Sequence, residues 1–239
     1  MTKKSSTQSM LYKEELINSI EPNFVFSKKP LNRFKLKEIN NINKGLNKIE
    51  KIGNLKKLIN SIQNCKIKEN SQNLIIGDGN IDSPIMIIGE TPGQEEEKKG
   101  KTFQGEQGAL LEKMLMAISI KKTNIYSSYA INFRPPEDRK PTSKEIKRYS
   151  IYLKELITII NPKIIILFGS TAMESVTASN QRISNERGKW KEIILKNKTY
   201  PLMITFSPSY LLRFPENKKF SWEDLKKVRQ KILDLKIKF

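Results

Sequence analysis

The sequence predicts an α/β protein with a three-layer α/β/α arrangement around a central, mostly parallel four-stranded sheet. Short apolar runs alternate along the chain with longer segments of helical spacing, and this alternation favours parallel strands with helices on both faces. The run Lys163–Phe168 is continuously apolar and β-branched, which is typical of a strand covered on both sides. A chain of 239 residues with 37% hydrophobic content is long enough for one such domain and a tail.

The predicted strands are short apolar segments that end next to glycine or polar residues. An extended piece, Leu74–Asn80, precedes the first of them. In chain order, the four strands are Pro84–Gly89, Asn124–Ala130, Lys163–Phe168 and Tyr200–Phe206.

The predicted helices separate these strands. Ser143–Ile160 carries its apolar residues on one face, with Ser143 as the expected N-cap and Glu145 in the first turn. The other expected helices are Lys51–Gln63, Gly105–Ile118, a segment that ends near Ala178, and Trp222–Leu235.

The composition divides the chain into two parts. Residues 1–45 are rich in Lys, Asn and Ser, and we predict a basic, partly disordered N-terminal extension with a short helix near Leu11–Ile20 and a linker. Residues 46–239 carry the strand and helix pattern and form the predicted domain.

Charge and rare residues narrow the class of protein. The formal net charge of +19 and the pI near 9.8 favour an anionic partner such as nucleic acid, although the abundance of Lys, Asn and Ile is also what an AT-rich genome produces. The chain has no histidine, so any catalysis depends on carboxylates, hydroxyls, arginine and backbone dipoles. One cysteine, Cys65, excludes an internal disulfide and fits a reducing, cytoplasmic location.

The segments with chemically active residues follow the predicted strands, after Ile88, Ala130, Phe168 and Phe206. In parallel α/β sheets, ligands bind beyond the carboxyl ends of the strands. We therefore expect these four segments to meet in one site.

The segment Gly89–Leu111 is the most specific of these. It contains Gly-Glu-Thr-Pro-Gly and then Gly-x-x-Phe-x-Gly-x-x-Gly-x-Leu-Leu. Together the two patterns resemble the first motif of the family 4 uracil-DNA glycosylases, which remove uracil from DNA in base-excision repair.

The resemblance continues in family order over roughly residues 55 to 236. The further segments that resemble family motifs are Asn132–Thr142, Asn161–Gly169, the pair Arg187-Gly188, Thr205–Pro215 and Trp222–Leu225. The resemblance implies the three-layer fold and a uracil-DNA glycosylase-type hydrolase that cleaves the N-glycosidic bond of uracil in DNA.

The resemblance also implies roles for individual residues. Phe103 is expected to stack on the extrahelical base, and Leu211 is expected to fill the emptied position in the base stack. The plainer alternative for Phe103 is core packing. Core packing is also the alternative for the pair Leu211-Leu212, and one of these two leucines is expected to pack in the core. For Glu95–Glu97 the alternative is a solvated turn. The implied catalytic residues are Glu90, Glu96 and Ser207; the base-binding residues are Gly89, Thr91, Phe103, Tyr129 and Asp138; the DNA-binding residues are Arg134, Arg139, Pro208, Ser209, Leu211 and Arg213.

The chain departs from the family at three polar site positions. Tyr129 replaces the asparagine that reads uracil, Asp138 a second asparagine, and Ser207 the histidine that donates to the leaving base. A tyrosine hydroxyl does not reproduce the paired donor and acceptor of an amide, and its ring is bulky enough to fill a base pocket. Loss of one preorganised donor typically slows a reaction by roughly 100- to 1,000-fold.

The family also has an iron–sulfur cluster held by four cysteines. The corresponding positions here are Ile62, Cys65, Phe133 and Tyr149. One thiolate does not hold such a cluster, so no cofactor is predicted.

Two kinds of function remain open at this point. One is a glycosylase that excises uracil from DNA. The other is a catalytically impaired relative that binds damaged or single-stranded DNA, or a glycosylase with a different lesion preference. DNA is the expected partner of each, and a monomer is the expected state.

Overall fold

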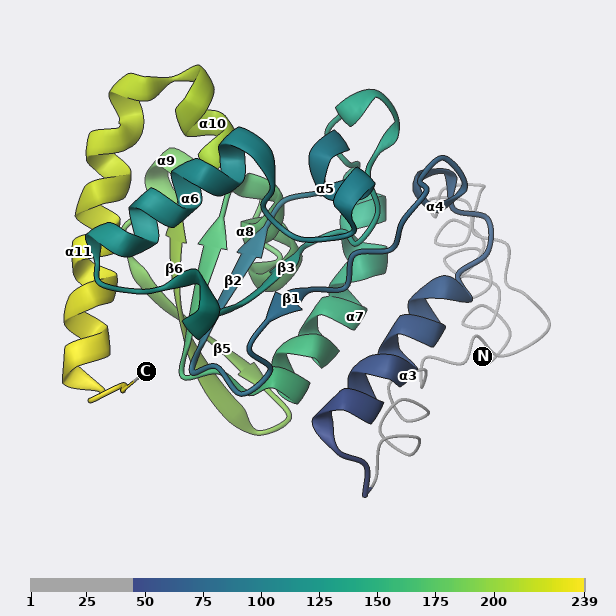
Figure 1. Cartoon of the computed structure of the whole chain (residues 1–239), viewed down its shortest axis with the longest axis horizontal. Coiled ribbons are helices and arrows are strands. Elements are labelled where there is room, and N and C mark those ends of the chain that lie inside the picture. Colours follow the sequence, from purple (N-terminus) through teal and green to yellow (C-terminus); the bar gives the residue numbers. More distant parts are fainter. Residues whose placement is uncertain (1–44, 239) are drawn as a thin grey trace, which may run out of the picture. The chain divides into compact units, whose positions relative to one another are not determined.

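The computed structural model describes residues 45–238, which form a three-layer α/β/α domain (Figure 1). The predicted N-terminal extension, residues 1–45, lies outside the described residues except for Gly45 and stays a prediction. None of the helices within residues 45–238 is long and apolar enough to cross a membrane.

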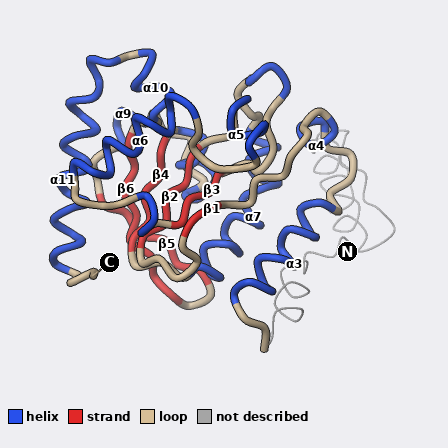
Figure 2. The backbone as a smooth tube through the Cα atoms, viewed as in Figure 1, coloured by secondary structure: helices blue, strands red, loops and turns tan. Residues whose placement is uncertain are grey.

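The sheet lies at the centre of the domain, where the strands run side by side (Figure 2). Its strand order is β1-β3-β2-β4-β6-β5. The central four strands are parallel, as predicted: β3 (Tyr126–Tyr129), β2 (Ile85–Gly89), β4 (Ile164–Phe168) and β6 (Lys198–Thr205).

Both edges of the sheet carry a strand that the prediction of four strands does not include. At one edge, β1 (Asp78–Gly79) pairs antiparallel with β3, so most of the expected extended piece is not strand. At the other edge, β5 (Trp190–Leu195) pairs antiparallel with β6. The half-buried, alternating pattern of β5 differs from the buried runs of the central strands, which is why apolar content alone did not predict it.

Alternate residues of the strands point into two separate cores. Met86 and Ile88 of β2 pack with the helices α3, α4, α7 and α8, whereas Ile85 and Ile87 pack with α6 and α11. This period of two, with apolar residues on both faces, explains why the central strands are continuously apolar.

The helices largely follow the predicted segments, with shifts of a few residues at their ends. The N-cap of α7 is Thr142 rather than Ser143, and Thr142 Oγ1 accepts a hydrogen bond from Glu145 N. The four short helices α4, α5, α9 and α10 lie in loops and were not predicted. The α-helices are α3 (Lys48–Asn60), α4 (Lys66–Glu69), α5 (Gln94–Lys99), α6 (Gly105–Ala117), α7 (Ser143–Ile160), α8 (Ser170–Thr177), α9 (Ile183–Glu186), α10 (Pro208–Arg213) and α11 (Lys218–Asp234); short 3-10 turns span Lys122–Asn124, Pro136–Asp138 and Pro215–Asn217.

Candidate active site

A cleft of about 720 Å³ opens beyond the carboxyl ends of the parallel strands, where the sequence predicted a site. Segments that follow β2, β3, β4 and β6 all contribute to its walls. Seven residues of the predicted site line it: Glu90, Thr91, Asp138, Arg139, Ser207, Ser209 and Arg213. The other seven lie outside this lining: Gly89, Glu96, Phe103, Tyr129, Arg134, Pro208 and Leu211.

Glu90 follows the last residue of β2 and is held at the amino end of α8. Its Oε1 accepts a hydrogen bond from Thr171 N at 3.1 Å and lies 3.4 Å from Ser170 Oγ. A helix amino terminus favours a negative charge. Gly169 packs against this carboxylate so closely that an added Cβ would lie 2.2 Å from Glu90 Cδ, and only glycine fits there. The structure therefore fixes the Glu90 carboxylate in the wall of the cleft.

Glu96 and Glu97 are buried, so the solvated turn describes only Glu95 within this run. Glu96 accepts hydrogen bonds from Gly93 N at 3.0 Å and Gln104 N at 2.9 Å, which joins both ends of the α5 loop. Glu97 accepts hydrogen bonds from Ser71 Oγ and Gln72 N. The geometry of Glu96 is that of a residue that shapes the loop and does not reach the cleft.

Phe103 and Tyr129 form a closed cluster over Gly89. Each is 2% exposed, and their ring centroids are 5.1 Å apart. The parallel register pairs Gly89 with Tyr129, and an added Cβ on Gly89 would lie 2.7 Å from Tyr129 Cε1 and 2.8 Å from Phe103 Cζ. The space beside the Phe103 ring, where the resemblance places an extrahelical base, is filled by Tyr129.

Tyr129 is also held through its hydroxyl group. The oxygen accepts a hydrogen bond from Phe103 N at 2.8 Å. Burial, together with the nearby Glu96 carboxylate, raises the pKa of Tyr129 well above its ordinary value, so the hydroxyl stays protonated. These contacts make the ring a fixed part of the core.

The segment after β6 turns into α10 at the rim of the cleft. Ser207 caps this helix: its Oγ accepts a hydrogen bond from Tyr210 N and lies 3.0 Å from Ser209 Oγ. Leu211 is 1% exposed and lines a small apolar groove between α6 and α11, whereas Leu212 is half-buried and lines the cleft. Leu211 therefore packs in the core, and Leu212 lies in the cleft wall.

The cations around the cleft differ in how they are paired. Arg134 donates two hydrogen bonds to Asp138, at 2.7 and 2.8 Å, and lowers the pKa of that carboxyl group. Arg139 likewise donates two hydrogen bonds to Glu145. Within the described part of the chain, Arg213 forms no ion pair, and its Nε donates to Ser209 O. Arg213 is therefore the cleft arginine whose charge is not balanced by a carboxylate.

Several residues of the cleft were missed by the sequence analysis. Ser170 and Thr171 follow Gly169 directly, and the rule that sites lie at strand ends was a signal that could have found them. Gln107, Lys140 and Leu212 gave no comparable signal, because their place in the cleft depends on how loops fold back.

The residues at the four cysteine positions of the resembled family do not fit an iron–sulfur cluster. Cys65 is buried, with its Sγ 3.3 Å from the hydroxyl of Tyr149. The Phe133 and Tyr149 rings meet edge to face at 6.2 Å, and Ile62 lies in the same apolar core. Phe133 and Ile62 have no ligand atom, and Cys65 supplies the one thiol among the four positions, where such a cluster is held by four thiolates. Residues 45–238 contain no group of three or more His, Cys, Asp or Glu arranged to hold a metal ion.

The chain is similar in sequence to known proteins. The family model of the "Uracil DNA glycosylase superfamily" matches residues 76–228. The "Type-4 uracil-DNA glycosylase" of Thermotoga maritima is 35% identical over 168 residues, which cover 69% of this chain and 86% of the relative. The protein of the same description from Sulfurisphaera tokodaii is 32% identical over 190 residues, which cover 76% of this chain and 85% of the relative. That from Archaeoglobus fulgidus is 28% identical over 184 residues, which cover 75% of this chain and 92% of the relative.

The fold and the site define a protein of the three-layer α/β/α class, with a carboxylate fixed in a cleft at the strand ends. The chain belongs to the uracil-DNA glycosylase superfamily.

Proposed function

We propose that this protein acts in base-excision repair and hydrolyses the N-glycosidic bond of uracil in DNA. The observation that carries the proposal is Glu90, a carboxylate fixed by Thr171 N in the wall of the cleft. The relatives described as type-4 uracil-DNA glycosylases support the same substrate.

In the proposed reaction, the target nucleotide leaves the base stack and enters the cleft, because its glycosidic bond is out of reach within a duplex. The Glu90 carboxylate then stabilises the positive charge that develops on the sugar, or orients the attacking water. Thr91, Ser207 and Asp138 line the same cleft, and Thr91 and Ser207 are proposed to contact the base. Arg213, with Ser209, is proposed to contact the DNA backbone.

A second candidate is favoured by Tyr129. Because its ring fills the space beside Phe103, a uracil in the position implied by the family would meet a side chain that is already packed there. In this reading the protein binds DNA and excises uracil poorly, or acts on a lesion that lies elsewhere in the cleft.

The first test is uracil release from a labelled single-stranded oligonucleotide and from a duplex with a U·G pair. We expect release by the wild type and a loss of about 100-fold or more in Glu90→Ala. Glu95→Ala is the matched control, because Glu95 is exposed on α5 and does not line the cleft. Salt-dependent binding of both oligonucleotides without release would support the second candidate, and neither binding nor release would refute both.

A further inference from the structure

Three aromatic rings form a continuous stack beside the cleft. Phe206 follows the end of β6, and Tyr210 and Phe214 follow along α10. The ring centroids of Phe206 and Tyr210 are 4.8 Å apart, and those of Tyr210 and Phe214 are 4.9 Å apart. Phe206 and Tyr210 line the cleft, so the stack leads from the cleft toward the outside of the domain.

The inner end of the stack is fixed by a partly buried ion pair. The Arg187 guanidinium lies 5.5 Å from the centre of the Phe206 ring, on which it stacks as a cation. Arg187 donates two hydrogen bonds to Asp224, which is 1% exposed and also accepts from Thr205 Oγ1 at 2.8 Å. Because both partners are held from several sides, the position of Phe206 is well determined.

The outer end of the stack is open. One face of Phe214 packs on Tyr210, yet the residue remains 45% exposed. It follows Arg213, which lines the cleft and has no carboxylate partner among residues 45–238. A large exposed ring costs solubility, and here it ends an ordered stack instead of packing into a core.

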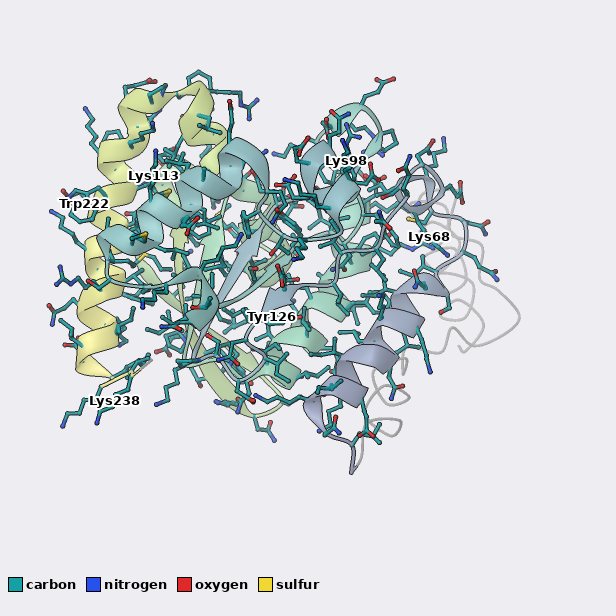
Figure 3. The ribbon with its side chains drawn as sticks, in the orientation of Figure 1. Lys68, Lys98, Lys113, Tyr126, Trp222 and Lys238 are labelled. Carbon is teal, nitrogen blue, oxygen red and sulfur yellow. The ribbon has the colours of Figure 1, made fainter. Side chains whose placement is uncertain are left out.

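Cations and further exposed rings follow Phe214 closely in the sequence. Within Arg213–Trp222, Phe220 and Trp222 are 41% and 40% exposed, and Lys219 lies 5.1 Å from the Phe220 ring centre. Figure 3 labels Trp222 on α11, and this residue lines the groove between α6 and α11. Aromatic rings for bases and cations for phosphates are the combination with which proteins bind single-stranded nucleic acid.

We propose that the exposed face of Phe214 stacks an unpaired base of single-stranded DNA, next to the nucleotide held in the cleft. The proposal rests on the proposed function, since it takes DNA as the ligand of the cleft. It assigns a DNA contact to a residue that the resemblance leaves without a role. The stack Arg187–Phe206–Tyr210–Phe214 then continues into the bases of the bound strand.

The test measures binding of a labelled single strand of about 12 nucleotides, and of the corresponding fully paired duplex, by fluorescence anisotropy. We expect Phe214→Ala to bind the single strand about 10-fold more weakly, because stacking on one aromatic ring contributes a factor of this order. The affinity for the duplex, whose bases are paired and stacked, should differ much less between Phe214→Ala and the wild type. Phe214→Trp should retain single-strand binding, and Phe214→Leu should lose it as Phe214→Ala does.

Leu233→Ala is the matched control, because it removes a 61% exposed apolar side chain from α11 without removing a ring. Single-strand binding by Phe214→Ala or Phe214→Leu equal to the wild type would overturn the stacking proposal alone. An equal loss for single strand and duplex would also overturn it, because the contact would then not read unpaired bases. A wild type that binds neither form would overturn the proposed function together with this inference.

Discussion

At the scale of single residues, Tyr129 has the largest effect on the site, because its side chain fills the space beside Phe103. It stands next to Gly89 in the parallel register, and its ring and Phe103 leave no room for a further ring between them. Phe103 is accordingly 2% exposed, so the family role of a stacking ring requires that Tyr129 move or be replaced.

Replacement of Tyr129 by asparagine tests this directly. We expect Tyr129→Asn to lower the free energy of unfolding by about 3–5 kcal/mol, because a buried aromatic ring is removed. We also expect faster uracil release than in the wild type, since the space beside Phe103 opens and an amide becomes available. Urea unfolding and the oligonucleotide assay measure the two effects.

Tyr126→Asn is the control for this variant. Tyr126 lies on the same strand and is equally buried, but it belongs to the core on the opposite face of the sheet. A gain of uracil release in both variants, or in neither, would contradict the role that we give to Tyr129.

At the scale of the secondary-structure element, the amino end of helix α7 is stabilised by one carboxylate, that of Glu145. Thr142 and Glu145 form a capping box, in which Glu145 also accepts hydrogen bonds from Thr142 N and from the guanidinium of Arg139. These contacts, above all those with Arg139, lower the pKa of Glu145 from 4.5 to about 2. One carboxylate therefore starts a helix and holds the arginine of the cleft loop.

The acid stability of the protein should reflect this carboxylate. Because its pKa is depressed in the folded state, its contribution is complete above pH 4.5 and is lost as the pH falls toward 2. We expect Glu145→Gln to lower the free energy of unfolding by about 1 kcal/mol at neutral pH. The difference in unfolding free energy between this variant and the wild type should shrink as the pH falls below 4.5. Urea titrations at several pH values measure this difference, and Glu112→Gln, at an exposed position of α6, is the control. A difference that does not change with pH would argue against the ion pair of Glu145 with Arg139.

Short elements at the strand ends were harder to predict than long ones. The apolar period of α7 and the runs of β2 and β4 are local signals, and their bounds agree with the sequence to within two residues at each end. Helix α10 has no such signal, since six residues form it only when Ser207 caps it and Leu211 finds a groove between α6 and α11.

At the scale of the whole molecule, the net charge of +19 favours binding to a polyanion. The structure distinguishes cations within this excess: Arg213 has no carboxylate partner among the described residues, whereas Arg134 is paired with Asp138 and Glu97. Only an unpaired cation adds fully to the attraction for phosphate.

Salt dependence of DNA binding should reveal this difference. We expect the logarithm of the association constant to fall linearly with the logarithm of salt concentration, and Arg213→Ala to reduce the slope by about one unit. Arg134→Ala should reduce it less, because its charge is already balanced. Equal slopes for the wild type and Arg213→Ala in anisotropy titrations would show that Arg213 does not contact phosphate.

The sequence by itself determined the fold class and indicated the four parallel strands and the strand ends where the cleft lies, because apolar periodicity and the alternation of strands and helices along the chain are local properties. It also indicated Glu90, which follows β2 directly. Only the tertiary structure decided that Tyr129 fills the space beside Phe103, that Glu96 and Leu211 turn away from the cleft, and that Phe214 ends an ordered stack. These outcomes depend on strand register and on packing between segments far apart in the chain, which no local pattern records.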